Sequence, residues 1–133
     1  MIELGTALKS TEAPYHRLVV LSDPGSNGGQ VVLVRVTTDD GSWPDRDCIL
    51  EPADWAELEH RSTVAYSTAK FGTVIRRLEL AIQSRAFRQI TSPPRNTLRK
   101  MINAGRTAKG MPPGAVKWLA NLPDTAPPTS SGS

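Results

Sequence analysis

The feature that most constrains the fold is a change in the spacing of apolar residues about halfway along the chain. Before residue 70 they form short runs rich in β-branched residues, of which 31–38 (VVLVRVTT) is the clearest. Branched side chains pack well on a pleated surface, so these runs predict β-strands. After residue 73 apolar residues recur every three or four positions, as on one face of a helix. The sequence therefore predicts a β-rich first part followed by helices.

Four short strands are expected, at 17–21, 31–38, 48–50 and 63–66. A run of turn-forming residues at 22–29 (SDPGSNGG) reads as a loop between the first two. Short strands at close spacing favour a small bent antiparallel sheet or a small barrel over about 15–70, rather than a parallel α/β unit. Residues 1–14 are polar with little periodic pattern, and they predict a flexible N-terminal arm.

Helices are expected at about 73–90, 93–104 and 113–120, with Gly105 as the stop of the second. The fold class is α+β, with one domain over 15–122. Residues 123–133 are rich in Pro, Ser and Gly and predict a disordered tail. The candidate core residues are apolar and lie on shared faces of these elements: Leu18, Val20, Val32, Val34, Val36, Ile49, Val64 and Leu78.

Composition excludes several classes of protein. No stretch approaches the roughly 20 apolar residues that cross a bilayer, and the first residues lack the apolar segment of a signal peptide. The single cysteine, Cys48, excludes an internal disulfide framework and a cysteine zinc site. Motifs for nucleotide, metal or cofactor binding are also missing, so no cofactor or metal is expected. The cytoplasm is the expected compartment, without a membrane partner.

Charge is divided unevenly along the chain. Residues 1–60 carry four Lys/Arg and eleven Asp/Glu, a net charge of −7, whereas residues 61–133 carry twelve and two, a net charge of +10. A basic second half suggests a polyanionic partner such as nucleic acid. The alternative is that the two halves attract each other within one fold, and the two interpretations are compatible.

Two histidines are candidates for acid–base chemistry. His16 and His60 each precede a predicted strand, and strand ends converge at the rim of a small barrel. Imidazole titrates near neutral pH, so one ring can accept a proton while the other donates one. RNA supplies its own nucleophile, the 2′-OH, so its cleavage requires only a base, an acid and cations. The structural alternative is that both histidines cap strands.

Both halves of the chain contain candidate cations for binding phosphate. A guanidinium group suits this role because it binds two phosphate oxygens at once. The candidates from the strand-rich part are Arg17, Arg35, Arg61 and Lys70. Those from the first predicted helix lie mostly off its apolar stripe: Arg76, Arg77, Arg85 and Arg88.

The order of these pieces resembles the PemK/MazF family of small toxin-like proteins. The run His16–Asp23 (HRLVVLSD) is similar to the family's first core strand, and Val31–Thr38 is similar to its next strand, which ends in Thr. Ser62-Thr63-Val64 matches a later Ser-x-Val strand. The chain looks closer still to PemK-like bacterial proteins with His-x-x-Val-Val-x-Ser-Asp-Pro and His-x-Ser-x-Val-x-Tyr. The resemblance covers about residues 15–90.

This resemblance implies an SH3-like barrel followed by helices, and a metal-independent endoribonuclease. In the family an arginine at the start of the first strand and a threonine at the end of the second do the catalysis. Thr37 matches the threonine, whereas His16 stands at the arginine position and Arg17 follows it. The resemblance also implies RNA, a cognate antitoxin or other protein, and a second copy of the chain as partners.

Three functions remain open from the sequence. The first is a toxin-type endoribonuclease that cleaves single-stranded RNA, with His16, Arg17 and Thr37 at its centre and His60 and Tyr66 assisting. The second is a non-catalytic module that binds nucleic acid or protein on the same barrel. The third is an interaction subunit whose basic half docks an acidic partner.

Overall fold

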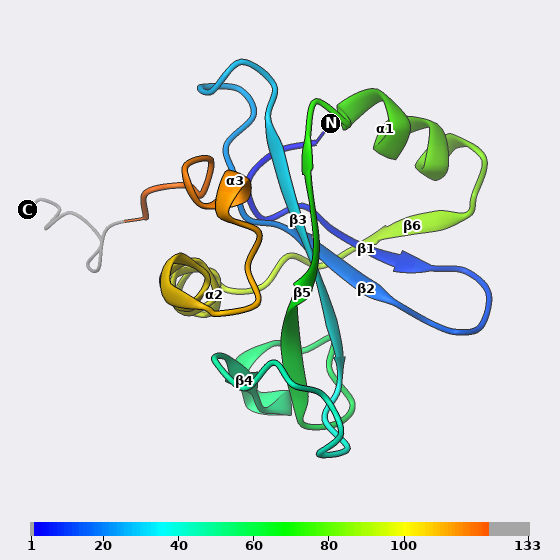
Figure 1. Cartoon of the computed structure of the whole chain (residues 1–133). Coiled ribbons are helices and arrows are strands. Elements are labelled where there is room, and N and C mark those ends of the chain that lie inside the picture. Colours follow the sequence, from blue (N-terminus) through cyan, green and yellow to red (C-terminus); the bar gives the residue numbers. More distant parts are fainter. Residues whose placement is uncertain (1, 123–133) are drawn as a thin grey trace, which may run out of the picture.

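The computed structural model describes residues 2–122, and the predicted tail at 123–133 lies outside them. Six antiparallel strands form one sheet in the order β4-β5-β3-β2-β1-β6 (Figure 1). Their bounds are β1 Ala7–Ser10, β2 Arg17–Val20, β3 Val31–Thr38, β4 Ile49–Leu50, β5 Ser62–Gly72 and β6 Phe87–Ile90. The outermost strands, β4 and β6, do not pair, so the sheet is bent but not closed. The α+β class and the bent antiparallel sheet are confirmed, and the closed form of the barrel is not.

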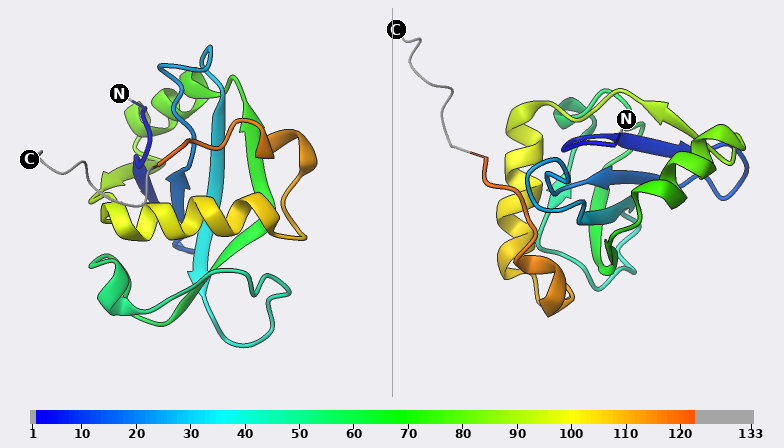
Figure 2. Two further views of the ribbon diagram at one scale, coloured as in Figure 1. Left: turned by 90° about the vertical axis from the view of Figure 1, so that its left-hand side faces the viewer. Right: turned by 90° about the horizontal axis from the view of Figure 1, so that it is seen from above.

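Helices cover both faces of this sheet. α1 (Ile75–Gln83) lies on one face and α2 (Arg95–Thr107) on the other, as the view from above in Figure 2 shows. A short 3-10 turn, η1 (Pro52–Asp54), follows β4, and α3 (Pro113–Val116) follows α2. Within the described residues no helix is both long and apolar enough to cross a membrane.

Each face of the sheet has its own core. On the α2 face, strand residues pack with Leu98, Met101 and Ile102 of the helix, whereas Leu78 of α1 packs on the opposite face. Six of the eight candidate core residues are buried, and Leu18 and Ile49 are partly buried. The α2 face holds Val32, Val34, Val36 and Val64, and the α1 face holds Leu18, Val20 and Leu78.

The predicted N-terminal arm is wrong. Residues 7–10 form β1, which pairs with β2 on one side and with β6 on the other. Ala7 and Leu8 are completely buried, one in each core. The segment has only these two adjacent apolar residues to mark it as a strand, and the partner β6 lies about 80 residues further along the chain. Pairing on both sides buries a strand whose own sequence carries a weak signal.

The predicted helix over 73–90 is too long. α1 ends at Gln83, and the chain reverses into β6. The amides of Arg85 and Ala86 donate to the carbonyls of Ile82 and Ala81, both at 3.0 Å, and Arg85 has a φ of 66°. These are the two hydrogen bonds and the left-handed residue of a Schellman helix end, a position where glycine is the usual signal. An arginine at this position carries no such signal.

Two further boundaries differ from expectation. α2 continues through Gly105 to Thr107, so this glycine does not stop the helix. A Cβ at Gly105 would lie 3.1 Å from the Tyr66 ring, which shows that the glycine permits close packing of α2 on β5. α3 ends at Val116 rather than 120, because a turn at 117–118 leads into a bridge between Leu119 and Ser22, and the amide of Ala120 donates to the carbonyl of Leu21.

Candidate nucleic-acid interface

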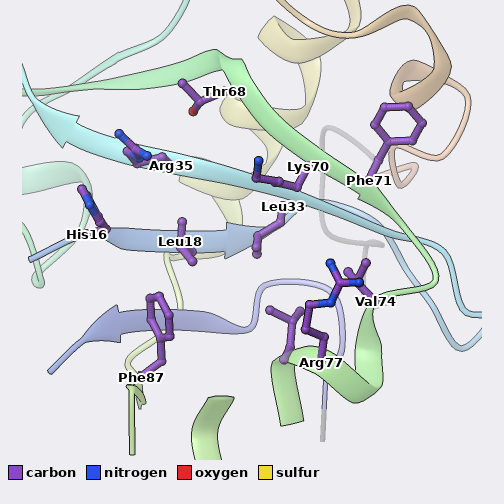
Figure 3. A pocket seen from close by; sticks show the side chains of 11 residues that line it. His16, Leu18, Leu33, Arg35, Thr68, Lys70, Phe71, Val74, Arg77 and Phe87 are labelled. Carbon is purple, nitrogen blue, oxygen red and sulfur yellow. The ribbon is translucent and has the colours of Figure 1, made fainter. Parts of the chain in front are cut away.

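A cavity of about 380 Å³ opens on the α1 face of the sheet (Figure 3). Its wall is built from four strands and one helix, with side chains from the start of β2, the middle of β3, the end of β5, α1 and β6. The lining residues are His16, Leu18, Leu33, Arg35, Thr68, Lys70, Phe71, Val74, Arg77, Leu78 and Phe87. We call this the α1-face pocket.

Strand alternation decides which side chains enter the pocket. Leu33 and Arg35 are two positions apart on β3, so they share a face, and Leu18 lies directly opposite Arg35 on β2. On the other side of β3, Leu33 pairs with Lys70 of β5. The register shifts between Leu33 and Arg35, so β5 carries extra residues there. This irregularity bends the sheet at the pocket.

The polar groups that line the pocket are cationic or neutral. His16 and Arg35 lie at one end, and Lys70 and Arg77 lie further along, as Figure 3 shows. No carboxylate of residues 2–122 lines the cavity or lies within 4.0 Å of these four side chains. The guanidinium of Arg35 lies 6.0 Å from the centroid of the Trp43 ring, a cation–π distance. The arginine and lysine side chains therefore face the cavity without an internal counter-ion.

His16 is held in place by β1. Its backbone amide donates to Ser10 Oγ at 2.7 Å, and the Ser10 amide donates to the His16 carbonyl at 3.0 Å. Burial and the neighbouring positive charge of Arg35 lower the pKa of the imidazole from its ordinary value of 6.5. The ring is therefore neutral at pH 7, so it can accept a proton or a hydrogen bond.

The lining of the pocket is largely apolar, with Leu18, Leu33 and Phe87 on the α1 face, and Phe71 borders it. Phe71 is 42% exposed, although large aromatic residues are usually buried. A Cβ at Gly114 would lie 3.0 Å from the Phe71 ring, so the ring is in contact with α3. Phe71 pairs with Val32 of the α2-face core, so its side chain starts from the face opposite Lys70 and its ring packs on α3. Phe87, which packs against the α1-face core, is therefore the ring on which a flat ligand in the pocket can stack.

The residues proposed from the resemblance are not all in this pocket. Arg17 pairs with Val36, which belongs to the α2-face core, so its side chain starts from the face opposite His16. Thr37 starts from the pocket face, two positions beyond Arg35. It lies opposite Thr63, whose hydroxyl donates to the Asp45 carbonyl, and it does not line the cavity.

His60 and Tyr66 also lie elsewhere. His60 is exposed in the bend before β5 and does not line the pocket, so the two imidazoles do not share this cavity. Tyr66 is fully buried in the α2-face core, and its hydroxyl donates to the Met101 carbonyl at 2.6 Å. Burial is the main cause that raises the pKa of Tyr66 far above its ordinary value of 10.0. It is a core residue joining β5 to α2.

The remaining candidate cations occupy different surroundings. Arg61 lies 3.6 Å from a carboxylate oxygen of Asp39 and 3.5 Å from one of Glu51. Arg76 is exposed on α1 and lines a separate shallow cavity that includes Glu79. Arg85 lies just after the end of α1 in the left-handed conformation, and Arg88 is exposed on β6.

Sequence reasoning missed Thr68, Phe71 and Phe87 of the pocket. Thr68 and Phe71 lie on β5 beyond the predicted strand 63–66, and Phe87 lies on β6, which reaches the sheet by pairing with β1, far away in sequence. Among residues 2–122, no group of three or more His, Cys, Asp or Glu side chains gathers in a way that would hold a metal ion. Compared with protein-family models and with curated proteins, this sequence matches none of them.

Proposed function

We propose that the chain is a module that binds single-stranded RNA through the α1-face pocket. The observation that carries this proposal is the combination of four basic side chains with an apolar lining that includes Phe87, and with no acidic group in the lining. Arginine and lysine side chains would bind phosphate oxygens. An unstacked base would lie against Phe87, as bases stack on aromatic side chains in single-strand binding proteins.

The size and chemistry of the pocket favour this ligand class. A volume of about 380 Å³ falls within the range of about 300–1,000 Å³ that is usual for small-ligand sites. It would accept one nucleotide and leave the rest of the strand on the surrounding surface. Duplex RNA fits less well, because its bases are stacked and paired and are not free to enter a cavity.

The experiment measures binding of a labelled oligonucleotide by fluorescence anisotropy at several salt concentrations. The double variant Arg35→Gln/Lys70→Gln removes two charges from the pocket. The slope of log K against log salt should fall by about 0.7 for each phosphate group that the variant no longer neutralises. Two such groups give a fall of about 1.4, with weaker binding throughout. The matched control, Arg95→Gln/Lys109→Gln, removes two exposed charges outside the pocket.

Equal effects of the two double variants would contradict the pocket as the site, since binding would then follow net charge alone. In that case an acidic protein docking on the basic surface would become the better account of the charge.

A second candidate function is metal-independent cleavage of the bound RNA, and His16 is the observation that favours it. Its imidazole is neutral at pH 7 and lies in the same pocket as Arg35 and Lys70. In this proposal His16 takes the proton of the 2′-OH, the 2′ oxygen attacks phosphorus, and the bond to the 5′ oxygen breaks. The 5′ oxygen takes a proton from water, because His60 does not line the pocket.

Incubation of the protein with labelled RNA in EDTA tests this second function. Cleavage should yield a 2′,3′-cyclic phosphate, and His16→Ala should lower the rate by about 100-fold or more, whereas His60→Ala should not. A folded protein that binds RNA and leaves it intact at every pH would contradict the cleavage proposal, and RNA binding would then be the remaining proposed function.

A further inference from the structure

A second group of cations lies on the opposite face of the sheet, in one row across three strands. Lys9 of β1 pairs with Arg17 of β2 on one side and with Arg88 of β6 on the other. Residues directly opposite in antiparallel strands share a face, with Cβ atoms about 5 Å apart. We call Arg17, Lys9 and Arg88 the cation row.

The cation row has no internal neutralising partner. Like charges directly opposite each other across strands destabilise a sheet. Yet within residues 2–122 no carboxylate lies within 4.0 Å of any of the three side chains. The Nε atom of Arg17 is buried and has no hydrogen-bond partner among these residues. A buried, unsatisfied guanidinium nitrogen normally calls for an acceptor.

An exposed aromatic ring stands beside the row. Tyr15, in the loop between β1 and β2, is 60% exposed, and its ring centroid lies 5.6 Å from Lys9 Nζ. Three cations next to an exposed aromatic ring form the combination that holds a phosphate backbone and stacks a base. We infer that the cation row and Tyr15 form a second subsite for phosphate groups, separate from the α1-face pocket.

The ligand we assign to this subsite is a further stretch of the RNA strand bound in the pocket, so the assignment rests on the proposed function. His16 and Arg17 are consecutive at the start of β2, and their side chains start from opposite faces. The first residues of β2 and β6 lie beside the last residues of β1, at one end of these three strands. An RNA strand leaving the pocket at His16 would pass around this end to reach Arg17.

Oligonucleotide length provides the test. A dinucleotide places one nucleotide in the pocket and is too short to extend along the cation row, whereas an oligonucleotide of about ten nucleotides reaches both sites. Lys9→Gln/Arg88→Gln should leave dinucleotide affinity unchanged, weaken the longer ligand, and lower its salt slope by about 1.4. Tyr15→Ala should weaken only the longer ligand. Arg95→Gln/Lys109→Gln is the charge-matched control. Equal losses for both lengths, or an unchanged salt slope, would overturn the subsite.

A separate measurement keeps the subsite testable if the chain binds no RNA. Pyrophosphate is titrated into ¹⁵N-labelled protein, and the amide resonances of Lys9, Arg17 and Arg88 are followed. Saturable shifts that disappear in Lys9→Gln/Arg88→Gln support a phosphate subsite even where the RNA proposal fails. Shifts that never saturate, or that persist in the variant, would overturn the subsite whatever the RNA result.

Discussion

At the scale of single residues, His16 is a titratable group that backbone hydrogen bonds hold in the pocket. Its backbone is hydrogen-bonded to Ser10, and its side chain lies at the same end of the pocket as Arg35 (Figure 3). Burial comes first and Arg35 second among the causes that lower its pKa below 6.5. Both disfavour the charged imidazolium, so protonating His16 must weaken the folded state.

This coupling predicts a specific pH dependence of stability. Between the lowered folded pKa and the ordinary value of 6.5, the unfolded chain binds more protons than the folded chain. The stability associated with neutral His16 is therefore fully present above 6.5 and is lost as pH falls toward the folded pKa. Urea unfolding of wild type and His16→Gln between about pH 5 and pH 8 should show curves that converge as pH falls. Parallel curves would contradict the assigned environment.

Tyr66 gives a second prediction at this scale. Tyr66→Phe removes the buried hydrogen bond to the Met101 carbonyl and keeps the ring. Because that carbonyl lies inside α2, we expect a loss of about 1 kcal/mol in the free energy of unfolding. RNA affinity and any cleavage rate should stay at the wild-type values. Abolished RNA binding or cleavage in a folded Tyr66→Phe protein would show that Tyr66 belongs to the functional site and not only to the core.

At the scale of secondary-structure elements, β1 is the strand that completes both the core and the cation row. It lies between β2 and β6 and carries Leu8 in the α1-face core. Leu8→Ala should lower the free energy of unfolding by about 2–5 kcal/mol, the usual cost of a cavity left by a buried leucine. Glu12→Ala, an exposed position in the following loop, should change it by less than about 0.5 kcal/mol.

Thermal and urea unfolding of these two variants distinguish a core strand from a loose arm. Similar small effects of Leu8→Ala and Glu12→Ala would show that the N-terminal segment does not contribute to the folded core.

The strands that can be predicted from sequence are those with their own strong local signal. β2, β3 and β4 lie near their expected positions, because each holds a compact apolar run. β1 and β6 escape prediction because they become strands by pairing with each other, and β5 runs on past Tyr66 through polar residues. Local patterns do not report such distant pairing.

The same limit applies to the site. His16, Arg35, Lys70 and Arg77 are candidates by residue type, and they do line one pocket. Arg17, His60 and Tyr66 are candidates on equal grounds, but strand alternation and burial place them elsewhere. A one-residue change of register exchanges the two faces of a strand, so the face of each side chain becomes known only with the pairing.

At the scale of the whole molecule, the two groups of cations adjoin at one end of strands β1, β2 and β6. The α1-face pocket and the cation row lie on opposite faces, and they meet where His16 and Arg17 begin β2. The ion pairs that Arg46 and Arg61 form with Asp39, and Arg61 with Glu51, lie among the loops before β4 and β5. Of these, the pairs of Arg61 join the basic second half to the acidic first half, and they lie away from the pocket.

The measurement that tests the central claim most directly is an NMR titration of the labelled protein with a short single-stranded RNA in EDTA. The account predicts saturable shifts centred on His16, Arg35, Lys70 and Phe87, with a rise in the His16 pKa when a phosphate group binds beside it. The shifts should weaken as salt is added. Saturable shifts confined to surfaces outside the pocket, or no binding at low salt, would contradict it.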